Sequence, residues 1–116
     1  EYALHLMELG LCYRNLARLD EAEAQYRKAL VSCENEPDGL LWIEATVHHG
    51  LANVLRDAER GDEALASFES ALELFDASDE PPVPNRRAAL RDFAVLLRGM
   101  GDEARAVKME ELAGSL

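Results

Sequence analysis

The chain contains 116 residues, of which 48% are hydrophobic and 6% aromatic, and its formal net charge at neutral pH is −11. A chain of this length forms one domain and buries roughly two thirds of its unfolded surface. The negative charge argues against nucleic acid and anionic membranes as partners, because both are bound through clustered Lys and Arg side chains. No apolar segment approaches the roughly 20 residues of a membrane span, and no signal peptide is recognisable.

The first two predicted helices cover residues 2–17 and 21–35 and form an antiparallel pair about a turn near residue 18. The first helix has one apolar face, made by residues at helical spacing: Leu6, Leu9, Gly10 and Tyr13. In this register Cys12 and Cys33 are about 12 Å apart along the helix axes. We therefore expect two free thiols rather than a disulfide, and hence a reducing compartment, the cytoplasm.

The second helix of each pair is predicted to begin with the same three residues. Asp20 opens the sequence Asp-Glu-Ala, and Asp62 and Asp102 open it again later in the chain. A carboxylate at this position accepts hydrogen bonds from the free amides of the first turn, so we expect all three residues to cap helices. Gly61 and Gly101 precede two of them and suit the left-handed end of the helix before.

Proline marks the connectors between the helix pairs. Pro37 suits the first turn of a third helix over about residues 38–58. Pro81, Pro82 and Pro84 are predicted to form a stiff connector, after which Asn85 caps a fifth helix over about residues 86–99. No segment has the pattern of a strand.

The apolar pattern repeats every 42 residues. Leu9, Gly10, Tyr13, Arg14, Ala22, Tyr26, Ala29 and Leu30 return as Leu51, Ala52, Leu55, Arg56, Ala64, Phe68, Ala71 and Leu72. In the third copy Asp102 is predicted to start the second helix two residues early, Glu110 replaces the aromatic residue, and Gly114 replaces the leucine. A period of this length is typical of stacked helical repeats, and the polar third copy suggests a capping helix with no repeat after it.

The pattern Leu6-x2-Leu9-Gly10-x2-Tyr13 followed by Ala22-x3-Tyr26-x2-Ala29 resembles the tetratricopeptide repeat, and the 42-residue spacing is similar to the long repeats of kinesin light chains and their bacterial relatives. The resemblance implies an all-α fold in which three antiparallel helical hairpins stack in a right-handed superhelix. The expected repeats are about residues 1–36, 37–79 and 84–116 of a single domain, the last ending in a polar capping helix.

No group of residues has the spacing of an active site or of a cofactor site. Glycine-rich phosphate loops and paired-cysteine motifs are absent from the sequence. Glu44 and His48 share a helix face, but two ligands without a third make a poor metal site. His49 points away from His48, and His5 is expected at the surface. We therefore predict a protein that is not an enzyme and holds no cofactor or metal.

In proteins of the family that the chain resembles, the first helix of each pair lines a concave groove that holds a peptide. The residues expected on this face are Leu4, Met7, Leu11, Arg14, Thr46, His49, Asn53, Arg56, Ala88, Arg91, Val95 and Arg98. None of them is acidic, so the groove is predicted to be positive and to bind an acidic peptide or a C-terminal carboxylate. The alternative is that Arg14, Arg56 and Arg98 pair with the aspartates or glutamates that open the second helices and merely cover the helix ends.

Leu4, Met7 and Leu11 give the first helix a second apolar face, which calls for a second partner. A bound peptide, a preceding segment or another copy of the protein would satisfy it. The predicted contact set is Leu4, Met7, Leu11, Arg14, Asn15, His49, Asn53, Arg56, Arg91 and Arg98. The functions that fit are a protein-interaction module that binds a peptide, a ligand-sensing domain of a larger regulatory protein, and a homo-oligomerisation module.

Overall fold

A computed structural model of the protein describes residues 2–36 and 39–116. These residues form six α-helices and no strand, which confirms the predicted all-α fold. The helices are α1 (Tyr2–Asn15), α2 (Leu19–Glu34), α3 (Leu41–Asp57), α4 (Gly61–Ala77), α5 (Val83–Gly99) and α6 (Glu103–Gly114). The predicted placement of Pro37 lies outside the described residues.

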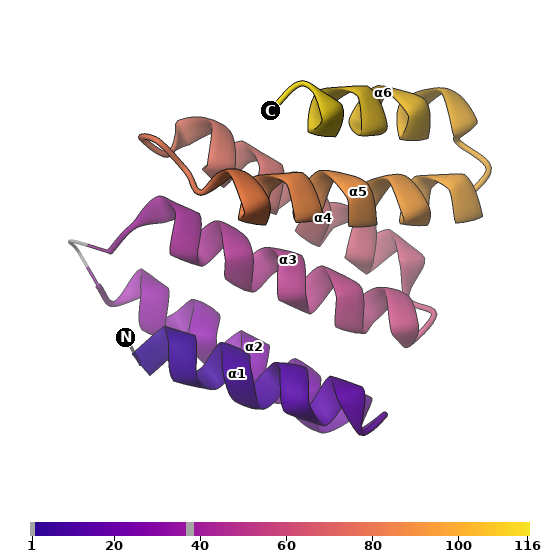
Figure 1. The fold of residues 1–116 in the computed structure, drawn as a ribbon. Coiled ribbons are helices and arrows are strands. Elements are labelled where there is room, and N and C mark those ends of the chain that lie inside the picture. Colours follow the sequence, from indigo (N-terminus) through magenta and orange to yellow (C-terminus); the bar gives the residue numbers. More distant parts are fainter. Residues whose placement is uncertain (1, 37–38) are drawn as a thin grey trace.

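The helices form three antiparallel hairpins, α1–α2, α3–α4 and α5–α6, that stack one on the next (Figure 1). The first helices of the hairpins, α1, α3 and α5, lie side by side in one layer, and α2 and α4 lie behind them (Figure 1). This arrangement gives the molecule one face built from three helices that are far apart in the sequence.

The turn inside each hairpin has the same geometry in all three repeats. The residue in the left-handed region is Ala17, Glu59 or Gly101, with φ values of 61°, 61° and 86°. The next amide donates back into the last turn of the helix, from Arg18 to the Tyr13 carbonyl at 2.9 Å and at the equivalent places later. These bonds satisfy carbonyls at the end of the first helix. The prediction for Gly61 was wrong, because this glycine is already the first residue of α4.

The capping prediction was right for only one aspartate. Asp102 precedes α6, and its carboxylate accepts a hydrogen bond from the Arg105 amide at 3.2 Å. Asp20 and Asp62 lie one residue inside α2 and α4 and cap neither helix. The second helices begin at Leu19, Gly61 and Glu103, 42 residues apart, so the third does not start early as predicted; only its aspartate is displaced.

The connectors also differ from the prediction. Helix α3 begins at Leu41 rather than near residue 38, and α5 begins at Val83 rather than near residue 86. Pro84 therefore lies in the first turn of α5, where its missing amide proton costs nothing. Asn85 is inside the helix and does not cap it; its side-chain amide donates to the hydroxyl of Thr46 in α3 at 3.3 Å.

Aromatic side chains from the second helices fill the space between the first helices. The Tyr26 ring lies between Gly10 of α1 and Gly50 of α3, and a Cβ atom added to Gly10 would stand 2.6 Å from the ring. Phe68 is fully buried and stacks on Phe93 of α5 with ring centroids 5.2 Å apart. Small residues on the first helices therefore allow each aromatic ring to penetrate between them.

The two ends of the stack differ. Helix α6 buries Ala106, Met109 and Ala113, and its Glu110 is exposed and paired with Arg98, as expected of a polar cap. At the other end, Ala3, Leu6 and Gly10 of α1 are buried. Leu9, predicted to lie in the same buried face, is 48% exposed.

Candidate peptide-binding face

A cavity of about 320 Å³ opens between α1 and α3 on the face made by the first helices. Leu4, Met7 and Leu11 line it from α1, together with Glu8 and Arg14. Thr46, His49, Gly50 and Asn53 line it from α3, and Tyr26 contributes from α2. The structure therefore brings Leu4, Met7, Leu11, Arg14, His49 and Asn53 of the predicted contact set to one place.

The sequence analysis missed three residues that line this cavity, Glu8, Tyr26 and Gly50. A Cβ atom on Gly50 would stand 2.6 Å from Cζ of Tyr26, so only glycine allows the ring to approach α3 this closely. Tyr26 is 4% exposed and is part of the cavity lining. Gly50 directly follows the His48–His49 pair and has no counterpart in the repeat pattern, so only the tertiary contact explains it.

Three polar side chains form a hydrogen-bonded cluster beside the cavity. Nε2 of His49 lies 2.7 Å from Oδ2 of Asp92, and Nδ2 of Asn53 donates to the same oxygen at 3.0 Å. Asn53 is 8% exposed, and its Oδ1 atom is buried with no partner among the described residues. Burial of a carbonyl oxygen without a donor is costly, so Asn53 is held in this position at some expense of stability.

Asp92 is ionised in this cluster at neutral pH. Partial burial acts to raise the pKa of its carboxyl group, but the hydrogen bonds from His49 and Asn53 act to lower it. The net result is a pKa below the usual value for aspartate. Asp92 thus links α5 to α3 as a charged acceptor.

Arg14 and Arg56 of the predicted groove are already engaged by an acidic or a carbonyl group. Nε of Arg14 donates to Oδ2 of Asp57 at 2.6 Å, which joins α1 to α3. Nη1 of Arg56 donates to the Asp92 carbonyl at 3.3 Å, which joins α3 to α5. The twelve-residue face has no acid of its own, but Asp57 and Asp92 reach it from adjacent positions. Its charge is therefore more balanced than the sequence pattern indicated.

Arg98 behaves as the alternative account predicted. Its guanidinium bonds Glu103, the residue after Asp102, at 2.9 Å and also Glu110 at 2.8 Å. Arg14 and Arg56 do not pair with the starts of α2 and α4, since those helix starts are bound by Arg18 and Arg60.

Besides Arg56 and Arg98, two members of the predicted set, Arg91 and Asn15, lie outside the cavity. Arg91 is exposed on α5 next to Asp92 and forms no ion pair with any of the described residues. Asn15 is exposed at the last residue of α1. Both are accessible to a partner that extends beyond the cavity along the face.

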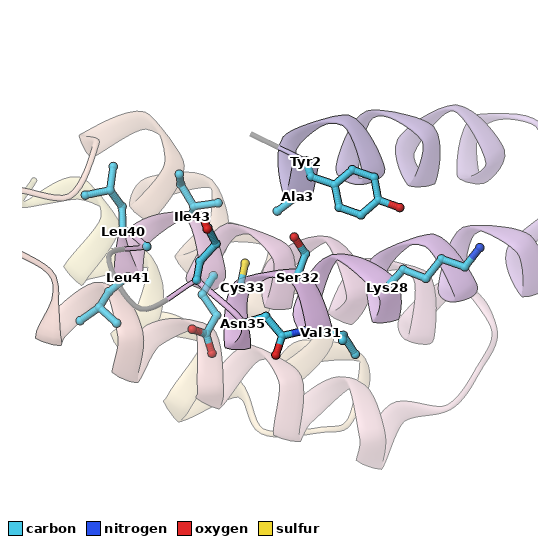
Figure 2. A pocket seen from close by; sticks show the side chains of 13 residues that line it. Tyr2, Ala3, Lys28, Val31, Ser32, Cys33, Asn35, Leu40, Leu41 and Ile43 are labelled. Carbon is cyan, nitrogen blue, oxygen red and sulfur yellow. The ribbon is translucent and has the colours of Figure 1, made fainter.

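A larger cavity, of about 730 Å³, lies at the N-terminal end of α1 and was not predicted (Figure 2). Tyr2 and Ala3 line it from α1, and Ser32 and Cys33 line it from α2 (Figure 2). Burial raises the pKa of the Cys33 thiol, which makes it a poor nucleophile. In the next repeat the fully buried Phe75 stands 42 residues after Cys33. The smaller side chain leaves this space open.

The remaining candidates for chemistry are weak in the part of the chain that the structure describes. No group of three potential metal ligands occurs there. Nε2 of His48 lies 4.0 Å from Glu44, and burial lowers the pKa of this histidine. His5 is exposed as expected, and both cysteines are free. None of the helices combines the length and the apolar character that crossing a membrane requires.

Comparison with known proteins agrees with the geometry. Family models described as tetratricopeptide repeat match residues 43–113 and residues 6–32. A crystal structure of MamA superposes with a TM-score of 0.74 at 17% sequence identity, covering 97% of this chain and 57% of that one. A second MamA structure, from AMB-1 in space group P212121, gives a TM-score of 0.67 at 25% identity and covers 98% of this chain and 58% of that one. The chain thus spans less than two thirds of either MamA chain. A search of curated proteins found no match.

Proposed function

Because the chain belongs to the tetratricopeptide repeat family, whose domains serve protein–protein interaction, we propose that it is a non-catalytic module that binds a peptide segment across α1, α3 and α5. The cavity between α1 and α3 carries the proposal, since an apolar wall and polar hydrogen-bonding groups meet in it. Cavities that are mostly apolar with a few placed polar groups are the usual sites of side-chain recognition.

In this proposal an apolar side chain of the peptide enters between Leu4, Met7 and Leu11. Leu4 is 36% exposed and Leu11 is 48% exposed, so a ligand that covers them removes apolar surface from water. Hydrogen-bonding groups of the peptide meet the polar side chains that line the α3 wall, Thr46, His49 and Asn53. The two interactions together fix both the position and the orientation of the segment.

The charge preference of the site is for an acidic segment or a C-terminal carboxylate. Arg14 lines the cavity and uses only Nε for its bond to Asp57, so its terminal nitrogens remain donors for a ligand. Arg91 adds an exposed positive charge on α5. The free thiols of Cys12 and Cys33 support a reducing compartment such as the cytoplasm as the place of action.

The test uses an array of acidic peptides, each with one large apolar residue, in free-carboxylate and amidated forms, and calorimetry on the peptides that bind. Leu11→Ser should weaken binding by about tenfold, because a half-exposed leucine side chain covered by a ligand contributes about 1.4 kcal/mol. Leu112→Ser is the matched control, because Leu112 is similarly exposed, at 44%, and lies on α6, which contributes no residue to the cavity.

A second pair of variants tests the charge preference of the site. Arg91→Glu should weaken binding of the acidic peptides, and the loss should shrink as salt rises. Lys108→Glu makes the same charge change at an exposed position on α6 and should leave binding unaltered. Arg56 is a poor probe, because its bond to the Asp92 carbonyl makes its replacement a structural change. An array without binders, or equal affinities for the Leu11→Ser variant and the parent, would refute the proposal.

A further inference from the structure

Three polar side chains of α3 line the cavity between α1 and α3, and His49 is the one that keeps a whole ring nitrogen unbonded. The hydroxyl of Thr46 already donates to a carbonyl of its own helix at 2.7 Å and accepts from the Asn85 amide at 3.3 Å. Asn53 already donates to Asp92 at 3.0 Å. Within the described part of the chain, His49 forms hydrogen bonds through Nε2 alone.

The unbonded nitrogen of His49, Nδ1, is accessible to a ligand. Among the residues that the structure describes, the only buried side-chain nitrogen or oxygen without a hydrogen-bond partner is Oδ1 of Asn53. Nδ1 also lacks a partner, so it is not buried. Helix α3 lies between α1 and α5 (Figure 1), and Nε2 of His49 is directed at Asp92 of α5. Because His49 lines the cavity, Nδ1 is the ring nitrogen that a bound segment can reach.

The contact with Asp92 decides which nitrogen of the neutral ring carries the proton. Nε2 lies 2.7 Å from Oδ2 of Asp92, and an ionised carboxylate can only accept a hydrogen bond. Nε2 therefore carries the proton, and Nδ1 carries a lone pair. The Nδ2 atom of Asn53 lies 3.2 Å from Nε2, but both atoms are donors, so Asn53 bonds Asp92 instead. Neutral His49 thus presents an acceptor to the cavity, and an acceptor repels a carboxylate.

The helices packed around His49 bring other titratable and charged groups into the cavity or beside it. These are Glu8 and Arg14 on α1, Tyr26 on α2, Arg56 and Asp57 on α3, and Arg91 and Asp92 on α5. Helix α4 meets the ring with Phe68, whose centroid is 6.0 Å from that of His49. Carboxyl, phenol and guanidinium groups ordinarily titrate outside the range from pH 5.5 to 7.5, whereas imidazole groups change their charge within it.

We infer that His49 determines the polar preference of the cavity and couples the binding of a carboxylate to the uptake of a proton, an inference that rests on the proposed function. In the neutral ring, Nδ1 accepts a hydrogen bond from an N–H or O–H of the ligand. When a carboxylate binds, Nδ1 takes a proton from solvent and donates it in a hydrogen bond, and the proton returns to solvent when the ligand leaves. Asp92 is a positioning residue, because it holds Nε2 and leaves Nδ1 to the ligand in both states.

The experiment uses two small probes, N-acetyl-leucine, which has one apolar side chain and a free carboxylate, and N-acetylleucinamide, in which a neutral amide replaces the carboxylate. Each probe is titrated into isotope-labelled protein at pH 7.5 and 5.5 and followed by NMR. N-acetyl-leucine should bind at least about fivefold more tightly at pH 5.5, where the ring is more often protonated. N-acetylleucinamide donates to the neutral ring and should bind no more tightly at pH 5.5. The ring nitrogen shifts of His49 should show a proton on Nε2 alone in the free protein at pH 7.5 and on both nitrogens in the complex with N-acetyl-leucine.

Three variants assign the effect. His49→Gln cannot titrate and should bind N-acetyl-leucine equally well at both pH values. His48→Gln is the matched control and should behave as the parent, because His48 is the next residue of α3 and does not line the cavity. Asp92→Asn should give both tautomers of His49, since an amide can either accept from Nε2 or donate to it; a proton on Nε2 alone in this variant would contradict the role of Asp92.

The outcomes separate this inference from the proposed function. If the parent binds N-acetyl-leucine equally well at both pH values, or if the pH dependence persists in His49→Gln, the inference is wrong and the peptide-binding proposal stands. Absence of binding of both probes at pH 5.5 would also overturn the inference. The peptide array with Leu11→Ser decides the proposed function independently, because covering the apolar wall does not depend on the protonation of His49.

Discussion

Tyr26 is packed between two glycines, and this contact predicts that replacing one of them by alanine destabilises the protein, although helix propensity alone predicts a gain in stability. Gly50 lies inside α3, where replacement of glycine by alanine normally stabilises a helix by about 1 kcal/mol. A Cβ atom there would stand 2.6 Å from Cζ and 2.9 Å from the hydroxyl of Tyr26. Tyr26 is 4% exposed and pressed against Gly10 from the other side, so its ring cannot retreat.

We expect Gly50→Ala to destabilise the protein by about 1–2 kcal/mol, since overpacking of this kind costs about 1–3 kcal/mol and the propensity gain offsets part of it. For a chain of this size the melting temperature should fall by roughly 3–10 °C, measured by circular dichroism. Gly99→Ala is the matched control, because Gly99 is also helical and nothing lies within 4 Å of an added Cβ. It should be neutral or stabilising.

A double-mutant cycle assigns the cost to the ring. In a Tyr26→Leu background the atoms that clash are gone, and Gly50→Ala should become neutral or stabilising, with a coupling energy of at least about 1 kcal/mol. If Gly50→Ala stabilises the parent as Gly99→Ala does, or if the cost persists without the tyrosine ring, the packing described for Tyr26 is wrong.

Three further predictions concern positions outside this contact. Cys33→Phe should stabilise the protein by about 1 kcal/mol by filling part of the larger cavity, whereas Cys12→Phe on an exposed face should bring no gain in urea titrations. Glu59→Gly should stabilise and Gly101→Ala destabilise by about 1 kcal/mol each, because both residues have positive φ values, and thermal unfolding distinguishes the signs. Burial lowers the pKa of His48, so the unfolded state binds more protons than the folded state below about pH 6.5. The contribution of His48 to the free energy of unfolding should therefore be complete above that pH and should fall as the pH decreases through the folded-state pKa. Urea titrations at pH 7.5 and 5 should show this dependence in the parent and not in His48→Gln.

The sequence was sufficient for the helices and their order because the 42-residue frame and the helical spacing of apolar residues act locally. It was not sufficient for the turns. Ala17 and Glu59 take the left-handed conformation although neither is the residue that normally marks it. The hydrogen bonds of the turn impose the conformation at these positions, and the composition of the segment gives no sign of it.

The candidate site was predictable in part, because helical spacing and the repeat frame determine which residues share a face. Helical spacing placed Leu4, Met7 and Leu11 on one face of α1, and the repeat frame placed His49 and Asn53 opposite them. The balance of charge was not predictable, because it depends on how far neighbouring side chains reach. Asp57 and Asp92 are outside the spacing that defines the face, yet each accepts a hydrogen bond from a residue within it.

The arginines that suggested a positive groove also tie the repeats together, and this dual role limits what each interaction contributes to binding. Arg14 bonds Asp57 across the α1–α3 interface with about a quarter of its side chain exposed. A ligand carboxylate that binds the terminal nitrogens of Arg14 shares the guanidinium with Asp57, and a partly exposed ion pair contributes only about 0–1 kcal/mol. The added ion pair therefore yields little affinity. In the proposed binding mode most of the binding energy comes from covering Leu4, Met7 and Leu11, while the arginines select among apolar segments those that carry a negative charge.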